Sequence, residues 1–173
     1  MPMIIKANEI KKRSRAGMKN PLRGIYVGED YDLLAAIMAR YPSGIATLET
    51  ALSLHGITDE YLNPPFFLSF NLGYRPIKDE RIVQIWEDRN TRALGTIAME
   101  RDGVEFLTYD KERLLLEVFR REKLISMEAY SAAISYYRKA ANDGTLSLPK
   151  LREYCKALPK GGIFRARIRK EIL

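Results

Sequence analysis

The sequence predicts an α+β fold in which a small, mostly antiparallel sheet packs with several helices and the C-terminal end is helical. Two observations predict this class. Short apolar runs separated by turn residues are concentrated between residues 65 and 109, and segments with apolar residues at helical spacing lie before and after them. With 173 residues, 46% of them hydrophobic, the chain can bury the core of one medium domain without a disulfide.

The N-terminal segment combines a basic stretch with a short strand. Residues 7–16 are predicted to form a short helix, Gly17–Pro21 a break, and Leu22–Val27 a strand. Helix, basic loop and strand in this order are typical of the end of a winged helix. We therefore expect a partial or minimal winged-helix element at residues 1–28, followed by a main domain at residues 29–173.

The elements of the main domain follow from periodicity and turn residues. Residues 31–40 and 45–55 are predicted helices, with Asp30 or Asp32 as the first N-cap and Pro42–Gly44 between them. The predicted strands are Phe66–Phe70, Arg81–Glu87, Gly95–Met99 and Val104–Tyr109, with a hairpin turn at Arg101–Gly103. Four helices are predicted after them: Lys111–Arg121, Ser126–Ala141, Ser147–Leu158 and Ile163–Ile172.

The net charge of +7 is unevenly distributed. In residues 1–28 seven basic residues face one acidic residue, and in residues 150–173 eight face two, so each end carries +6 and the middle −5. Two basic ends around an acidic body suit contact with a polyanion at the ends. The alternative is that these charges belong to solvated helix faces.

Composition points away from export, membranes and metals. Cys155 is the single cysteine, no Cys/His cluster with zinc spacing occurs, and no apolar run approaches the length of a membrane span. We therefore expect a cytoplasmic protein without a cofactor, a metal or a membrane partner, and the oligomeric state is left open.

Catalytic constellations are scarce. His55 is the only histidine and has no serine or cysteine motif beside it, so a core or helix-end role is favoured; Cys155 is interpreted as a partly buried apolar filler. The carboxylates of the sheet region mostly neighbour Arg or Lys, which favours a solvated sheet face over a metal site: Asp79, Glu80, Glu87, Asp88, Glu100, Asp102 and Glu105. We expect no enzyme, with a small metal-dependent nuclease as the remaining enzymatic alternative.

A second basic cluster lies near the C-terminus. Gly161-Gly162 precede a predicted helix that carries Arg165, Arg167 and Arg169. A helix N-terminus with nearby arginines favours anions, so these three residues are candidate contacts for an anion or a nucleic acid. An ordinary turn is the alternative.

Four segments in order resemble one family. They are LRGIYV at residues 22–27, YPSGIATLETALSLHGITDEY at 41–61, PPFFLSF at 64–70, and TYDKERLLLEVFRREKLISMEAYSAAISYYRK at 108–139. Together they resemble the AbiEi antitoxins of bacterial type IV toxin–antitoxin and abortive-infection systems. The resemblance covers about residues 20–140, and the order and spacing of the segments carry it more than any one of them.

The resemblance implies a repressor that binds its own promoter through a winged helix and counteracts a nucleotidyltransferase-like toxin through the larger domain. Arg23, Gly24, Ile25 and Tyr26 match the family's wing, and Glu112 and Arg113 match its C-terminal signature. Fewer residues precede Arg23 than precede the wing in the family, so the winged helix is expected to be shortened.

Two hypotheses follow. The first is an antitoxin-like transcriptional regulator of phage defence, which binds DNA through basic N-terminal residues and counteracts the toxin. Its predicted DNA-binding residues are Lys11, Lys12, Arg13, Arg15, Lys19 and Arg23. The second is a protein-interaction or inhibitor module without specific DNA binding, in which the charged ends meet an acidic partner.

Overall fold

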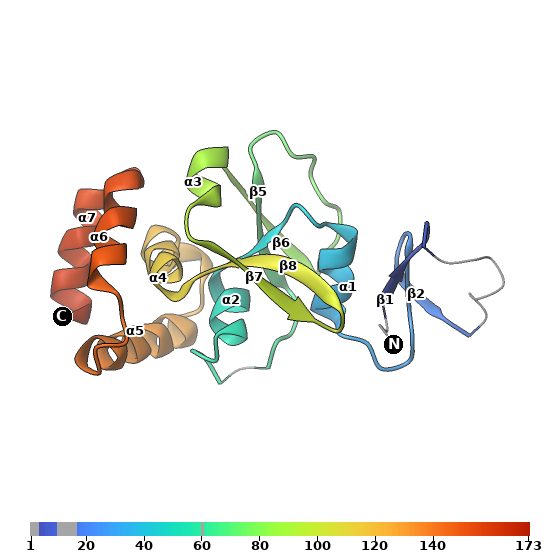
Figure 1. Ribbon diagram of the computed structural model, residues 1–173, viewed down its shortest axis with the longest axis horizontal. Helices are drawn as coiled ribbons and strands as arrows, with labels where there is room; N and C mark the ends of the chain where they lie inside the picture. The colour runs from blue at the N-terminus through green and yellow to red at the C-terminus, as the bar shows by residue number, and fades with distance from the viewer. Residues whose placement is uncertain (1–3, 10–16, 60) are drawn as a thin grey trace. The chain divides into compact units, whose positions relative to one another are not determined.

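The protein has an α+β fold, as the sequence predicts. A computed structural model describes residues 4–9, 17–59 and 61–173 (Figure 1). Within these ranges the chain forms seven α-helices and two sheets, of three and five strands. By their internal contacts the residues divide into two units, one of residues 1–45 and 98–107, the other of residues 46–97 and 108–173. The boundary predicted at residue 28 divides the chain by charge and motif, and it stays a prediction.

The first unit contains a three-stranded antiparallel sheet. Its strands are β1 (Ile4–Lys6), β2 (Lys19–Leu22) and β3 (Ile25–Val27), in the order β1-β3-β2. The prediction of one strand over Leu22–Val27 is wrong, because the chain turns at Arg23-Gly24 and Leu22 pairs with Ile25. Gly24 has φ 83°, a conformation that favours glycine, and therefore closes a β-hairpin where the apolar run suggested a continuous strand.

Helix α1 (Leu33–Arg40) packs against the strands of this sheet. Asp32 is its N-cap, as anticipated, and its side chain accepts a hydrogen bond from the backbone N–H of Ala35 at 2.8 Å. Arg101 holds the same carboxylate in an ion pair at 2.5 Å. Of the helix predicted at residues 7–16, residues 7–9 instead form a turn, and residues 10–16 lie outside the described residues.

The five-stranded sheet has the order β6-β5-β4-β8-β7. Its strands are β4 (Ile45–Ala46), β5 (Phe66–Asn71), β6 (Ile82–Glu87), β7 (Thr96–Arg101) and β8 (Val104–Tyr109). All four strands predicted in this region are present, and the turn at residues 102–103 joins β7 to β8. The β5–β6 pair is parallel, with Phe66 opposite Ile82 and Asn71 opposite Glu87.

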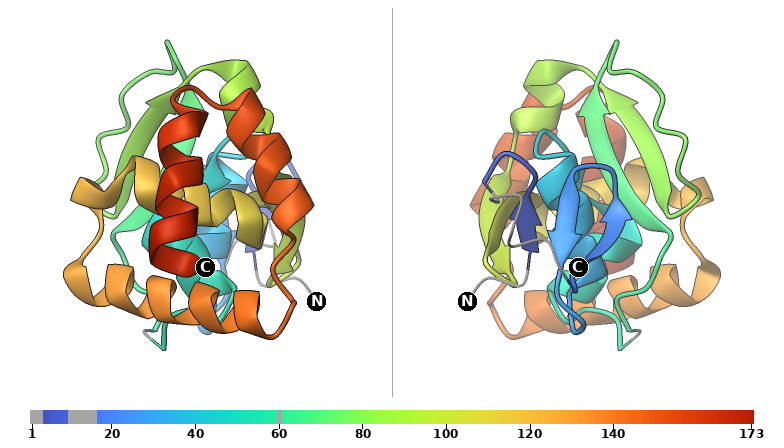
Figure 2. Two further views of the ribbon diagram at one scale, coloured as in Figure 1. Left: turned by 90° about the vertical axis from the view of Figure 1, so that its left-hand side faces the viewer. Right: turned by 90° about the vertical axis from the view of Figure 1, so that its right-hand side faces the viewer.

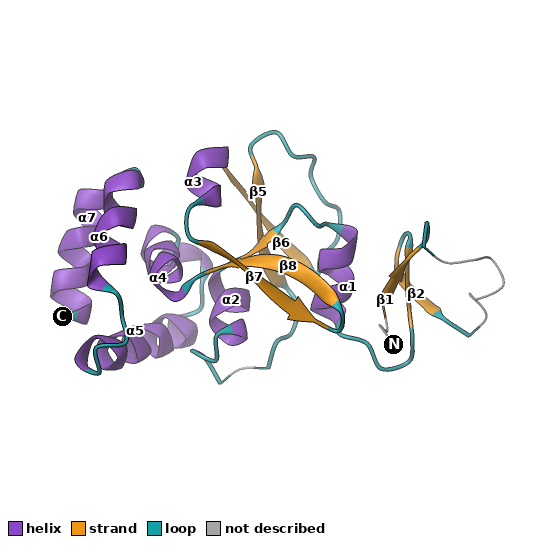
Figure 3. Ribbon diagram, viewed as in Figure 1, coloured by secondary structure: helices purple, strands orange, loops and turns teal. Residues whose placement is uncertain are grey.

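The helices of the second unit are coloured purple in Figure 3. They are α2 (Leu48–Leu54), α3 (Arg89–Ala93), α4 (Lys111–Arg120), α5 (Met127–Asn142), α6 (Leu148–Ala157) and α7 (Gly161–Arg167), with a 3₁₀ turn η2 (Glu122–Leu124) and a final π-type turn η3 (Ile168–Ile172). All the predicted helices of this unit are present, although residues 45–46 of the helix predicted at 45–55 form strand β4 instead, and α3 was not predicted.

Helix α4 is the centre of the helical part. Residues 112–119 are all buried, and α4 contacts α2, α5, α6 and α7. The left view of Figure 2 shows α6 and α7 side by side with α4 behind them. Asp110, Ser126 and Ser147 cap α4, α5 and α6 through their side chains, which fixes where each helix begins. No helix in the described part of the chain has the length and apolar character needed to cross a membrane.

Candidate functional site

Of the six predicted DNA-binding residues, Lys19 and Arg23 are described by the structure. Lys11, Lys12, Arg13 and Arg15 lie outside the described residues. Lys19 begins β2, Arg23 lies in the turn between β2 and β3, and both side chains are exposed. Within the described ranges neither side chain forms a hydrogen bond or an ion pair, so both positive charges are available to a ligand.

The opposite side of the same hairpin is apolar. Leu22, Ile25 and Val27 are buried, and β2 and β3 both contact α1. The backbone carbonyl of Gly24 also accepts a hydrogen bond from the N–H of Ala7 at 2.8 Å. The hairpin is thus anchored by its apolar side, while its cations face solvent.

The three C-terminal arginines do not form one cluster. Arg167 pairs with Glu122 at 2.8 Å and with Glu171 at 2.7 Å, and its guanidinium lies 4.3 Å from the centre of the Phe119 ring. Burial by itself would lower the pKa of Arg167, but hydrogen bonds to Glu171 and Glu122 outweigh it and raise the pKa. The charge of Arg167 is therefore compensated within the protein.

Tyr130 belongs to the same cluster. Its hydroxyl donates a hydrogen bond to Glu171 at 2.6 Å and accepts one from Arg167 at 2.7 Å. Burial, together with the hydrogen bond to Glu171, raises the pKa of Tyr130 to about 12. These contacts hold η3 and α7 to α5 and have the character of a structural clamp.

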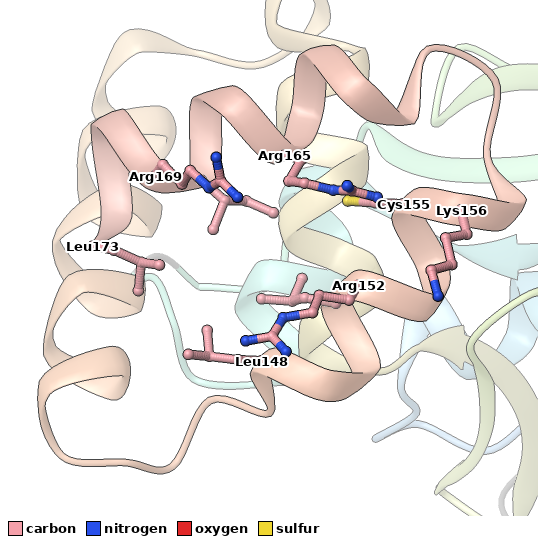
Figure 4. Close-up of a pocket in the computed structure, with 9 residues that line it drawn as sticks. Leu148, Arg152, Cys155, Lys156, Arg165, Arg169 and Leu173 are labelled. Carbon is pink, nitrogen blue, oxygen red and sulfur yellow. The ribbon is translucent and has the colours of Figure 1, made fainter.

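Arg165 and Arg169 lie on a groove (Figure 4). Arg152 and Lys156 of α6 line the same groove, so two pairs of cations with a spacing of four residues meet there. All four side chains are exposed, and within the described part of the chain none has a hydrogen-bond or ion-pair partner. The groove has a cavity volume of about 230 Å³.

The floor of this groove is apolar. It is formed by Leu148, Leu151, Cys155, Ile168 and Leu173, and no carboxylate side chain lines it. Cys155 is buried, as its interpretation as an apolar filler requires, and burial raises the pKa of its thiol although Arg165 acts in the opposite direction. A mostly protonated, buried thiol suits packing better than nucleophilic chemistry.

A buried ionic network connects β6 and α4. Glu87 and Glu117 are 5% and 1% exposed, so Glu87 does not belong to a solvated sheet face, and that interpretation is wrong for this residue. Their carboxylates pair with Arg113, Arg120 and Arg121; Arg113 Nη2 lies 3.9 Å from Glu87, and Arg121 Nε lies 3.4 Å from Glu117. Asp79, by contrast, pairs with the neighbouring Arg81 at 2.6 Å, as expected.

The network neutralises charges that burial would otherwise penalise. Burial by itself would raise the pKa of Glu117, but the guanidinium groups of Arg113 and Arg120 outweigh it and lower the pKa. Arg113 is completely buried and also donates hydrogen bonds to the backbone carbonyls of Leu94 and Thr91, each at 3.1 Å. Arg113 thus ties α4 to the segment around α3.

His55 has a structural role at the end of a helix. It is the C-cap of α2, as a helix-end role predicts, and its Nε2 donates a hydrogen bond to the backbone carbonyl of Tyr109 at 2.7 Å. Among the described residues no group of His, Cys, Asp or Glu is placed to hold a metal ion.

Fold and side chains thus define a class: an α+β protein with a basic N-terminal hairpin, a buried charged core around α4 and a basic groove on α6 and α7. No protein-family model matches the chain, and no curated protein matches it. Among solved structures the chain is similar to the RV2827C protein from Mycobacterium tuberculosis, with a TM-score of 0.65 and 12% identity over 92% of this chain and 68% of that one. At this identity the likeness shows a shared fold.

Proposed function

We propose that the protein is a cytoplasmic, non-enzymatic, antitoxin-like transcriptional regulator that contacts DNA through its basic N-terminal segment. The observation that carries the proposal is the ordered set of AbiEi-like segments, the first of which, LRGIYV, includes the turn and the second strand, β3, of a β-hairpin. A hairpin of this kind is the form that a wing takes in winged-helix proteins, where it contacts the DNA backbone.

The charge distribution of the hairpin supports the same role. Lys19 and Arg23 are exposed and have no partner within the described residues, whereas Leu22 and Ile25 are buried on the other side. Cations on a hairpin anchored by its apolar side suit phosphate contacts, which position a protein on DNA without reading its sequence. The basic residues Lys11, Lys12, Arg13 and Arg15, which lie outside the described residues, complete the proposed DNA-binding set.

The second part of the proposal is that the protein counteracts a nucleotidyltransferase-like toxin through its larger domain. This part is supported by the segment at residues 108–139, which resembles the family's C-terminal signature and contributes the buried helix α4. A gene for such a toxin next to the gene for this chain is the expected genomic arrangement.

A salt titration of duplex DNA binding tests the DNA half. Fluorescence anisotropy of a labelled duplex from the upstream region is measured between low and moderate salt for the wild type, for Lys19→Ala/Arg23→Ala and for Arg13→Ala/Arg15→Ala/Arg23→Ala. Each lost phosphate contact lowers the magnitude of the slope of log K against log salt by about 0.9. We expect a reduction of up to about 1.8 for the double variant and weaker binding for the triple variant.

A matched control removes two cations elsewhere. Arg75 and Lys78 are exposed, lie in the β5–β6 connection and, within the described residues, have no side-chain partner. Arg75→Ala/Lys78→Ala should leave the slope unchanged. No detectable binding by the wild type at low salt would refute the DNA-binding half and favour the alternative of a protein-interaction module.

A further inference from the structure

The groove on α6 and α7 combines a cationic rim with an apolar floor. Its rim carries four cations, Arg152, Lys156, Arg165 and Arg169, and its floor is made of leucine, isoleucine and cysteine side chains. An apolar surface edged by charges of a single sign is typical of an interaction site rather than of a solvated face.

The positive charge of the groove is not balanced from within. Glu171 follows Arg169 closely in sequence, but its carboxylate is engaged by Arg167 and Tyr130. None of the nine lining residues is acidic, and within the described residues none of the four cations has a hydrogen bond or ion pair. The groove therefore presents four unpaired positive charges to any ligand.

The spacing of the cations explains why each helix presents its pair on one side. Arg152 and Lys156 are four residues apart on α6, and Arg165 and Arg169 are four apart across α7 and η3, so each pair lies on one side of its helix. Arg167, between the members of the second pair, is directed to Glu122 and Phe119 instead. Figure 4 shows Arg165 and Arg169 on one helix facing Arg152 on the other.

The floor decides between the polyanions that such a rim could bind. Single-stranded nucleic acids are held by aromatic rings on which bases stack, and none of the nine lining residues is aromatic. A groove of about 230 Å³ is larger than the roughly 150 Å³ apolar cavity that accepts benzene, so it accommodates a bulky apolar side chain. An amphipathic helix that lies in a hydrophobic groove supplies such side chains from one face.

We propose that the α6–α7 groove binds an acidic segment of a partner protein, with one or more bulky apolar side chains on the groove floor and carboxylates paired with Arg152, Lys156, Arg165 and Arg169. This inference does not depend on DNA binding or on toxin neutralisation.

Three synthetic helical peptides, each labelled with fluorescein, test the inference by anisotropy with the full chain. The probe has a Leu/Phe stripe flanked by Glu, the first control has Ser in place of Leu and Phe, and the second has Gln in place of Glu. The probe should bind, and more weakly as salt rises, while each control peptide should bind at least about tenfold more weakly. Equal binding of the probe and the Ser peptide would show that the apolar floor does not contribute to binding, and would overturn the inference.

Charge reversal locates the binding. Arg165→Glu/Arg169→Glu should weaken probe binding at least about tenfold, because attraction becomes repulsion at the rim. Arg75→Glu/Lys78→Glu makes the same change in net charge at exposed residues outside the groove and should change the affinity by less than about twofold. Equal losses of affinity in both variants would show that net charge alone causes the loss, and would overturn the inference.

The floor is tested separately at the chain end. Leu173 lines the groove and is 64% exposed, so Leu173→Ser, which leaves the charge of the groove unchanged, should keep the fold and weaken binding of the probe at least about threefold. Unfolding transitions that match the wild type establish that each variant is folded. If Arg165→Glu/Arg169→Glu is not folded, the result for Leu173→Ser decides the inference. Loss of duplex DNA binding in Arg165→Glu/Arg169→Glu without loss of probe binding would assign the groove to nucleic acid instead.

Discussion

The buried carboxylate of Glu117 should contribute strongly to the stability of the second unit. We predict that Glu117→Gln, which keeps the volume of the side chain and removes its charge, destabilises the protein strongly. Glu117 is 1% exposed and pairs with Arg113, Arg120 and Arg121, and Arg113 is completely buried. Loss of the carboxylate leaves a buried guanidinium with less compensation than it has now.

The expected magnitude follows from the geometry. Breaking a buried ion pair by removing one partner costs about 3–5 kcal/mol, because the other charge stays buried without its counterion. Here Glu87 and two backbone carbonyls still contact Arg113, so we expect the lower end of that range, about 3 kcal/mol. Glu80→Gln, at an exposed residue, is the matched control and should lie within about 0.5 kcal/mol of the wild type.

Urea unfolding measured as a function of pH provides the assay. The folded-state pKa of Glu117 is lowered below 4.5, so its stabilising contribution is fully present above about pH 4.5 and is lost as the pH falls through the folded-state pKa. The difference in unfolding free energy between wild type and Glu117→Gln should therefore be constant near neutral pH and shrink in acid. A difference below about 1 kcal/mol at neutral pH, or one that grows in acid, would refute the assigned role of the network.

Four further outcomes are expected, in two pairs of variants. Arg167→Ala should lower the unfolding free energy by about 1–2 kcal/mol, since it breaks the contacts with Glu122 and Glu171, whereas Arg165→Ala should stay within about 0.5 kcal/mol in the same urea titration. Gly161→Ala should destabilise by about 3 kcal/mol or more, because a Cβ there would overlap the carbonyl of Cys155, while Gly162→Ala has open space and should be neutral or stabilising by about 0.5–1 kcal/mol in thermal melts. Equal effects in either pair of variants would contradict the packing on which these predictions rest.

Much of the fold is predictable because its signals are local. The helices that begin after Asp32, Asp110 and Ser126 follow from a capping residue and an apolar stripe, and each cap is present as a hydrogen bond to the backbone. The hairpin turn between β7 and β8 is equally local. The break at Gly24 is local as well, but it lies inside an apolar run whose period suits a continuous strand.

The site is less predictable because it depends on tertiary contacts. Spacing in the sequence places Arg165 and Arg169 on one side of a helix, but it does not indicate that Arg152 and Lys156 face them from another helix. The spacing of Arg113 and Glu117 indicates a helical ion pair, which is usually a surface feature. Its burial follows only from the packing of α4 against α2, α5, α6 and α7.

The proposed antitoxin activity is tested most directly in growing cells. The nucleotidyltransferase-like toxin that the proposal expects to be encoded beside this chain is expressed alone, with the chain, or with the destabilised Glu117→Gln variant as a control for folded protein. We predict that the toxin alone arrests growth, that the wild-type chain restores it, and that the variant restores it less. Continued arrest in cells that contain folded wild-type chain would contradict the proposed function.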